Sequence, residues 1–370
     1  MSSLSDLDKV VLIEAIQQQQ RAAMMIVVVA SHQLNPMSII PLPVLIELDN
    51  PPRLRPTLPP RVNISDFSED DALLRCRFTK YEMGKIVEAM GLPGIIKTEN
   101  RLKFCAVDGL FILLRRLSYP ATLDLLATEF GRDPTSVSRI FNHMLDLVYS
   151  QYAGTLHLWK GLTRSRVRKY TRSITEYDSA VINVWSFIDG THRDIARPSD
   201  SEEQIATFNG KDRTNQLRYQ LIVAPDGLFV STCGPYVGTR HDVRMLQDSK
   251  IQELLSPIVV QNVTNMIYGD AAYRGEPLVM HPFIDAQRGT WQRQYNKLMS
   301  RMRVRIENQF AKTYNLFAFT SLKKNQRVGN MPVALFFFVG ILFVNIHTCM
   351  HGCNMPFRMD CPSVEEYLSI

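Results

Sequence analysis

The chain has 370 residues, of which 45% are hydrophobic and 21% are charged, a composition typical of folded globular proteins. This composition excludes a wholly disordered chain, a collagen and a coiled coil, and the length predicts two or three domains. The 42 Lys and Arg outnumber the 36 Asp and Glu by 6, so the placement of the charges is more informative than their sum. Six cysteines are too few for a disulfide scaffold and indicate reduced thiols in a soluble intracellular protein.

The N-terminal segment, residues 1–65, is expected to lie outside the folded domains. Acidic residues precede its first apolar run, so no secretory signal is expected. Residues 1–33 predict a weak helix. Eight of the chain's 20 prolines fall between Pro36 and Pro60, and this density predicts an extended linker because proline interrupts helices and central strands.

Residues 66–150 predict an all-α domain. Thr79-Lys-Tyr-Glu82 is a capping box for a helix that ends at Gly91, and further helices are expected over 102–117, 121–130 and 135–149. The last two helices are separated by a glycine-containing turn, a helix-turn-helix pattern. This pattern predicts DNA binding, although the same arrangement also occurs in plain helical bundles. The side chains placed to contact DNA are Ser136, Ser138, Arg139, Asn142 and His143.

Residues 151–175 are predicted to be a basic linker. Six Lys or Arg fall between residues 160 and 172, with no acid among them. Such a cluster can hold a DNA backbone or serve in nuclear import, whereas the more common role of a charge run is a solvated surface. The residues of this cluster assigned to DNA are Arg164, Arg166, Arg168 and Lys169.

From residue 176 to residue 352 the pattern changes to strands mixed with helices. Strands are expected over 184–188, 218–224, 228–233 and 265–268, and helices over 242–255 and 291–316. The second and third strands form a hairpin through Pro225-Asp226-Gly227, and Asp226 is assigned no role beyond the turn. This order predicts a mixed α/β layer.

The apolar stretch Val333–Met350 approaches the length of a membrane-spanning helix. Asn345, His347 and Thr348 lie within it, so we predict a helix buried in the protein core and no membrane association. Residues 353–370 are expected to form a C-terminal tail. The side chains of His347, Cys349, His351, Cys353 and Cys361 offer an alternative zinc site, but ligands on one apolar helix are unusual, and reduced core thiols are favoured.

Two predicted strands end in a carboxylate beside a glycine, at Asp189 and Asp270. Glu307 is the only acid among ten Lys or Arg between residues 288 and 327. Three such carboxylates supply the hard oxygen ligands that Mg²⁺ and Mn²⁺ prefer, and two ions can clamp an in-line phosphoryl displacement. Singly, however, an Asp-Gly after a strand is more often a turn. The basic residues around Glu307 that are assigned to DNA are Arg301, Arg303 and Arg305.

Four blocks of the sequence resemble the signatures of PIF/Harbinger transposases, a family of DDE-type nucleases. They are FIDGTH at 187–192, GTRHD at 238–242, YGDAAY at 268–273 and RVRIENQF at 303–310, in the family's order. The resemblance covers about residues 78–350. It implies an α/β fold in which a ribonuclease-H-like catalytic domain, a mixed sheet flanked by helices, occupies residues 176–352 after an all-α helix-turn-helix domain at 66–150.

The resemblance implies that Asp189, Asp270 and Glu307 are the catalytic residues and the ligands of two Mg²⁺ or Mn²⁺ ions. Asp242 competes with Asp270 for the role of second ligand. In the preferred assignment, His241 and Asp242 orient the metal ligands or the substrate.

The implied activity is cleavage of phosphodiester bonds at transposon ends and transfer of the freed 3′-hydroxyl to target DNA. Two alternatives are a domesticated, catalytically silent DNA-binding protein and a nuclease without strand transfer. The expected partners are double-stranded DNA, a Myb-like DNA-binding protein and further copies of the chain. The expected location is the nucleus.

Overall fold

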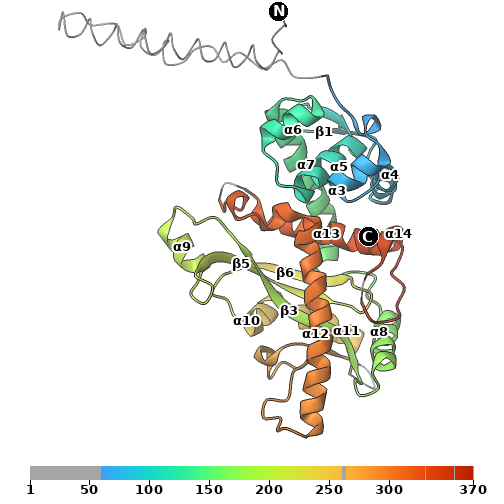
Figure 1. The fold of residues 1–370 in the computed structure, drawn as a ribbon, viewed down its shortest axis with the longest axis vertical. Helices are drawn as coiled ribbons and strands as arrows, with labels where there is room; N and C mark the ends of the chain where they lie inside the picture. Colours follow the sequence, from blue (N-terminus) through green and yellow to red (C-terminus); the bar gives the residue numbers. More distant parts are fainter. Residues whose placement is uncertain (1–59, 261–263, 330, 354, 370) are drawn as a thin grey trace, which may run out of the picture. The chain divides into compact units, whose positions relative to one another are not determined.

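The computed structural model describes residues 60–260, 264–329, 331–353 and 355–369 (Figure 1). The helix predicted within residues 1–33 and most of the proline-rich linker lie outside these residues. The described residues, from 60 onward, form one compact unit. Its helical first part and its sheet contribute to one hydrophobic core, in which Phe141 of the first part packs on Phe336 of the second with 5.9 Å between ring centroids.

The first part of the described chain is helical, as predicted, with one short hairpin. The helices are α3 (Glu69–Cys76), α4 (Lys80–Ala89), α5 (Ala106–Ser118), α6 (Leu123–Phe130) and α7 (Pro134–His157). The hairpin joins β1 (Ile95–Lys97) to β2 (Lys103–Cys105). The helix predicted from residue 102 therefore begins too early, because Phe104 points into the core between two exposed neighbours, which is a strand pattern.

The predicted helix-turn-helix is present as α6 and α7. Gly131 ends α6 in the left-handed conformation with φ of 56°, and Asp133 caps α7 by accepting a hydrogen bond from the Ser136 amide at 3.0 Å. Helix α7 continues past the predicted end at residue 149, because Tyr152 and Leu156 extend its buried stripe.

The segment predicted as a basic linker contains helix α8 (Arg164–Tyr177). Val167, Tyr170 and Ile174 are buried at helical spacing, and the helix packs against the first long strand of the sheet, β3 (Val184–Asp194). The basic side chains alternate with this apolar stripe. The charge run was therefore interpreted as a linker, although it belongs to a helix that packs on the sheet.

A six-stranded mixed sheet forms the second part of the chain. Besides β3 it contains β4 (Phe208–Asn209), β5 (Thr214–Val223), β6 (Phe229–Val237), β7 (Met266–Tyr268) and β8 (Val279–Met280). The order across the sheet is β6, β5, β3, β7, β8, and β4 pairs with the start of β5. Pairs β3–β7 and β7–β8 are parallel, and the others are antiparallel. The predicted mixed α/β fold is confirmed.

Helices surround this sheet. They are α9 (Ser201–Thr207), α10 (Asp242–Ser249), α11 (Ile251–Val259), α12 (Trp291–Leu316), α13 (Val333–His351) and α14 (Val364–Leu368). The single helix predicted over 242–255 is in fact α10 and α11, which meet at Lys250 in the left-handed conformation with φ of 54°. Helix α12 has the predicted bounds and runs lengthwise past the sheet (Figure 1).

Among the described residues, α13 is the one helix long and apolar enough to cross a membrane, and 72% of its apolar window is buried inside the protein. It contacts α7, α12 and β6. Its buried Asn345 pairs with the backbone of Phe229 through two hydrogen bonds of 2.9 Å and donates another to the Tyr367 hydroxyl. Helix α13 is therefore a packing helix of this core, as predicted.

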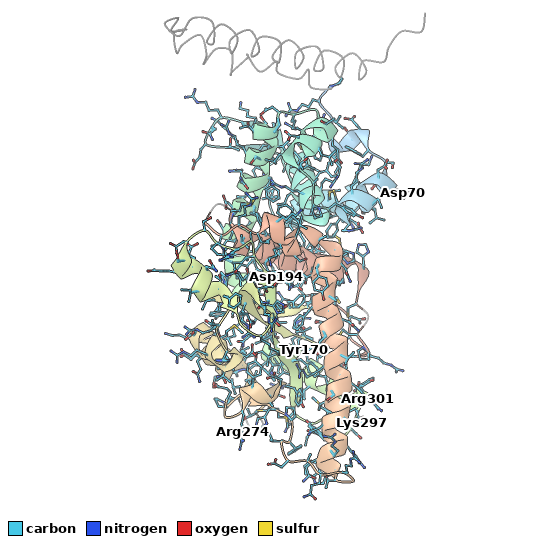
Figure 2. The ribbon with its side chains drawn as sticks, turned by 60° about the vertical axis from the view of Figure 1, so that its left-hand side comes forward. Asp70, Tyr170, Asp194, Arg274, Lys297 and Arg301 are labelled. Carbon is cyan, nitrogen blue, oxygen red and sulfur yellow. The ribbon has the colours of Figure 1, made fainter. Side chains whose placement is uncertain are left out.

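Asp226 in the β5–β6 turn is more than a turn residue, contrary to our expectation. It is fully buried, and one carboxylate oxygen accepts a 2.6 Å hydrogen bond from the Tyr170 hydroxyl of α8; Figure 2 marks Tyr170 within the sheet-bearing part. Burial raises the pKa of Asp226 from 3.8 to about 6, although hydrogen bonds from Tyr170 and Leu228 oppose the shift.

This raised pKa predicts a pH-dependent contribution of Asp226 to stability. The folded state favours the protonated acid, so the contribution is complete below about pH 4 and is lost as pH rises through about 6. Relative to Asp226→Asn, the wild-type free energy of unfolding should fall by on the order of 2–3 kcal/mol over this interval. Denaturant unfolding of wild type and Asp226→Asn across this pH range measures the change. A difference in free energy of unfolding between the two proteins that stays constant with pH would contradict the prediction.

Candidate active site

The pairing register of two parallel strands brings Asp189 and Asp270 together. Phe187 of β3 lies opposite Tyr268, the last residue of β7. Asp189 and Asp270 each follow two residues later, so both carboxylates lie where β7 ends and leaves this edge of β3 uncovered. The expectation that Asp189 ends its strand is wrong, since pairing with β5 carries β3 on to Asp194.

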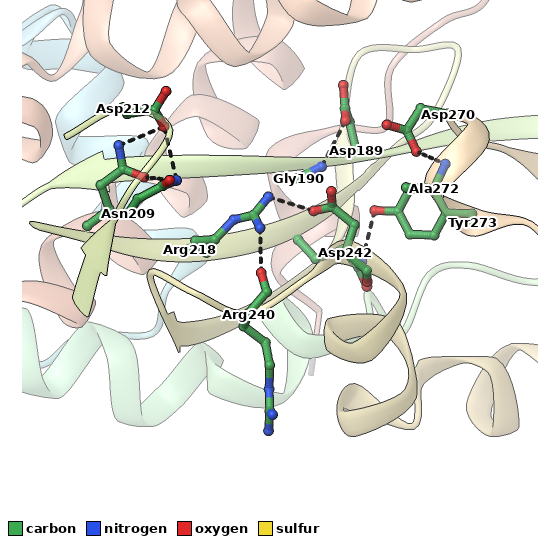
Figure 3. A network of polar contacts seen from close by, with 12 residues as sticks. Asp189, Gly190, Asn209, Asp212, Arg218, Arg240, Asp242, Asp270, Ala272 and Tyr273 are labelled. Atoms are coloured by element: carbon green, nitrogen blue, oxygen red, sulfur yellow. Dashed lines mark hydrogen bonds and ion pairs between the residues drawn. The ribbon is translucent and has the colours of Figure 1, made fainter. Parts of the chain in front are cut away.

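A third carboxylate, Asp242 in the first turn of α10, reaches the same place. Figure 3 shows Asp189, Asp242 and Asp270, carried by three separate segments, in one neighbourhood. The approach of Asp242 depends on Gly190, because a Cβ atom at this position would lie 2.3 Å from Asp242 Oδ1. The glycine beside Asp189 therefore makes room for a carboxylate from the chain itself.

Burial and like charges make this cluster electrostatically unfavourable without a cation. Burial raises the pKa of Asp189, and the nearby charge of Asp270 adds to the rise while Arg303 opposes it. Burial likewise raises the pKa of Asp242, where Arg218 opposes the shift and Asp270 reinforces it. The charge of Asp270 thus raises the pKa of both Asp189 and Asp242, and a divalent cation bound beside these carboxylates would offset that repulsion.

Arg303 of α12 supplies a positive charge within the structure. Its Nη2 lies 2.9 Å from Asp189 Oδ2, and both side chains are largely buried. Burial lowers the pKa of Arg303, but the negative charges of Asp189, Asp270 and Glu307 outweigh this effect and raise its pKa.

Glu307 lies one helical turn after Arg303 on α12, and its side chain is exposed. It interacts with the Arg303 charge, so it lies on the side of α12 that serves the cluster.

Polar residues of β5 support the cluster, and sequence reasoning missed them. Arg218 Nη2 lies 2.9 Å from Asp242 Oδ1, and the Gln220 side-chain amide donates to the Asp242 carbonyl and to the Tyr273 hydroxyl. Gln216, Arg218 and Gln220 alternate along the strand and share one face of the sheet. This alternation of polar side chains in a largely buried strand was the available signal. Tyr268 and Tyr273, which flank Asp270, are buried.

The donor chemistry of Asp189, Asp242 and Asp270 fits a hard divalent cation. Asp189 Oδ1 accepts from the Gly190 amide and Asp270 Oδ1 from the Ala272 amide, both at 2.9 Å, so the backbone orients two of these carboxylates. Within the described part of the chain, however, no three His, Cys, Asp or Glu side chains lie close enough together to hold a metal. The alternative zinc site is likewise not formed. No disulfide joins the six cysteines, all of which are described.

The residues predicted to contact DNA through the helix-turn-helix lie at the start of α7. Arg139 and Asn142 are exposed. Ser136, Ser138 and His143 are half-buried, and the Ser136 hydroxyl donates to Asp133.

Among the predicted DNA-binding residues of α8, Arg166 and Arg164 make contacts within the protein as follows. Arg166 pairs with Glu366, lies 4.0 Å from Asp226 and covers the ring of Trp159. Arg164 donates to the Pro257 carbonyl at 3.0 Å. Arg168 and Lys169 are exposed. On α12, Arg301 is exposed, while the side chain of Arg305 lies outside the described part of the chain. His241, exposed, is the residue before α10.

Comparison with known proteins identifies the sheet-bearing part. A family model described as DDE superfamily endonuclease matches residues 188–337, which run from β3 into α13. This range contains Asp189, Asp242, Asp270 and Glu307. No curated protein and no solved structure matches the chain. Residues 188–337 of this chain therefore form a DDE superfamily endonuclease domain, as the resemblance to PIF/Harbinger transposases predicted.

Proposed function

We propose that this chain is a metal-dependent DNA transposase that cleaves phosphodiester bonds at transposon ends and transfers the 3′-hydroxyl to target DNA. The observation that carries the proposal is the convergence of Asp189, Asp242 and Asp270 at one edge of the sheet in a DDE superfamily endonuclease domain. Asp270 raises the pKa of the largely buried Asp189 and Asp242, so keeping these carboxylates together is costly, and a cation-dependent function accounts for it.

In this proposal Asp189 and Asp270 are metal ligands, and either Glu307 or Asp242 completes the set. Bound Mg²⁺ or Mn²⁺ supplies charge stabilisation at the phosphodiester and activation of the attacking oxygen. The protein residues have separate tasks. The Gly190 and Ala272 amides orient the two aspartates, and Arg218 holds Asp242. Arg303 pairs with Asp189 and would have to release this carboxylate for an ion to be held there.

Double-stranded DNA is the proposed substrate. Exposed Arg139 and Asn142 at the start of α7 and exposed basic residues of α12 support it, since affinity for a polyanion grows with such contacts and falls as salt rises. The proposal also includes action in the nucleus as a homo-oligomer with a Myb-like partner protein.

A specific observation favours the second candidate, a catalytically silent DNA-binding protein descended from such an enzyme. Arg303 pairs with Asp189 at 2.9 Å and so occupies the charge of a carboxylate that a metal would need. Incubating the full chain with supercoiled plasmid and Mg²⁺ separates the candidates. Metal-dependent nicking supports the enzyme, whereas salt-sensitive binding without nicking supports the silent protein. Joining of cleaved ends to a second duplex distinguishes a transposase from a simple nuclease.

Gly190→Ala tests whether Asp242 must approach Asp189. The new Cβ atom overlaps Asp242 Oδ1, so the carboxylate has to move away from Arg218. We expect a loss of roughly 1–2 kcal/mol in stability and a larger proportional loss of nicking. Thermal unfolding and nicking rates measure the two effects. Gly210→Ala is the matched control, because a Cβ atom there meets nothing within 4 Å; equal activity of the two variants would contradict the role of Gly190.

A further inference from the structure

A groove beside the first half of α12 is not part of the carboxylate cluster. Its volume is about 630 Å³, and it lies between the segment after α8, strand β8 and α12. Three large apolar side chains that line it are exposed to solvent: Ile182 is 58% exposed, Phe283 39% and Trp291 63%. Exposed aromatic rings gathered at a groove mark a binding surface.

The aromatic wall of the groove is held in place by specific contacts. Phe283 packs edge-on against Trp291 and Tyr295, with ring centroids 5.0 and 5.7 Å away. The backbone of Phe283 is tied to α12 because Asn296 accepts from its amide at 2.9 Å and donates to its carbonyl at 2.7 Å. The rings are therefore oriented before any ligand arrives, which lowers the entropic cost of binding.

Positive charge flanks this aromatic wall. Lys297 and Arg301, one helical turn apart on α12, are exposed and line the groove, and Figure 2 labels both on α12. One acid, Asp178, also lines it, and its carboxylate accepts from the Ala180 amide at 3.0 Å. Aromatic faces beside cations are the combination that binds unpaired nucleotides, because bases stack on the rings and phosphates pair with the cations.

We propose that this groove binds an unpaired segment of the DNA substrate, with a base stacked on Trp291 and the backbone held by Lys297 and Arg301. A duplex offers its phosphates but keeps its base faces covered, so only unpaired nucleotides use the ring of Trp291. The inference rests on the proposed action on DNA. At 1.5 Å per helical residue, Trp291 lies about 18 Å along α12 from Arg303. The groove thus holds strand a few nucleotides from the carboxylate cluster.

The test compares binding of a blunt DNA duplex with binding of the same duplex carrying a short oligothymidine extension. Fluorescence anisotropy at fixed salt should show tighter binding of the extended duplex by wild type. Trp291→Ala should reduce that preference by roughly 5- to 100-fold, while Trp291→Phe, which keeps a ring, should retain most of it. Tyr81→Ala removes an aromatic side chain that is 67% exposed on α4 and serves as the control.

Tryptophan emission gives a second reading. Trp159 and Trp185 are buried, so quenching by the oligothymidine extension should come from Trp291 and disappear in Trp291→Phe. An extension preference that survives Trp291→Ala overturns the inference. The inference is also overturned if Trp291→Ala converts a dimer of the protein into monomers while the preference for the extended duplex stays unchanged, since the groove would then be an interface between copies of the chain. Asp189→Asn separates this inference from the proposed function. If wild type does not nick DNA, but wild type and Asp189→Asn both prefer the extended duplex, the groove binds unpaired DNA and the catalytic proposal fails. If wild type nicks DNA but shows no preference for the extended duplex, the catalytic proposal stands and the inference about the groove fails.

Discussion

Asp189→Asn is expected to abolish metal-dependent nicking while leaving DNA binding intact. The substitution keeps the shape of the side chain but removes the negative charge that β3 contributes to the carboxylate cluster. Loss of a metal ligand removes several kcal/mol of transition-state stabilisation, so the rate should fall by about a thousandfold. Affinity for the plasmid should stay equal or rise, because an acid near a polyanion is neutralised. Nicking rates and binding isotherms on the same preparations measure both effects.

The matched control for this experiment is Glu99→Gln, which neutralises an exposed carboxylate between β1 and β2. It should nick DNA at the wild-type rate. Residual nicking by Asp189→Asn at a rate similar to that of Glu99→Gln would show that the observed nuclease activity does not arise at the cluster. Asp270→Asn should behave like Asp189→Asn, because the parallel register places both carboxylates at the same level.

Arg303→Gln is expected to make the protein less stable without metal and more responsive to it. Asp189 would lose its partner while remaining largely buried, and removing one member of such a pair costs roughly 3 kcal/mol. The vacated site then carries uncompensated negative charge, so Mg²⁺ should bind the variant at least about tenfold more tightly than wild type. Calorimetric titration with Mg²⁺ measures the affinity, and thermal unfolding with and without Mg²⁺ measures the regained stability.

Arg301→Gln provides the comparison, because this residue is exposed on the same helix two positions earlier. Its Mg²⁺ affinity and metal-free stability should match those of wild type. Arg303 would lose its assigned role as the cation that divalent ions displace if Arg303→Gln bound Mg²⁺ no more tightly than Arg301→Gln.

The mixed α/β fold could be predicted from the sequence because the strongest local sequence signals agree with the tertiary structure. The turn at Gly227, the capping box at Thr79 and the apolar stripe of α12 each specify a local element. Asp189 and Asp270 could also be paired in advance, since they belong to neighbouring strands in a ribonuclease-H-like layout. Some of the predictions fell short because of long-range pairing. Pairing with β5, for example, extends β3 beyond Asp189.

The contacts that complete the candidate site were beyond sequence reasoning because they join residues far apart in the chain. Arg303 pairs with Asp189 across 114 positions, and Arg218 pairs with Asp242 across 24. Burial of Asp226 depends on Tyr170 of α8, a segment whose basic composition predicted a linker. Side-chain pairing of this kind depends on packing geometry, which local periodicity does not encode.

We propose that Asp189, Asp242 and Asp270 form a site for divalent cations in which Arg303 is a removable counter-charge. Anomalous diffraction from crystals of the protein grown with Mn²⁺ tests it most directly. We expect Mn²⁺ density against Asp189 and Asp270, with the guanidinium of Arg303 withdrawn from Asp189. Absence of Mn²⁺ from these carboxylates at saturating concentration, with Arg303 still paired to Asp189, would contradict it.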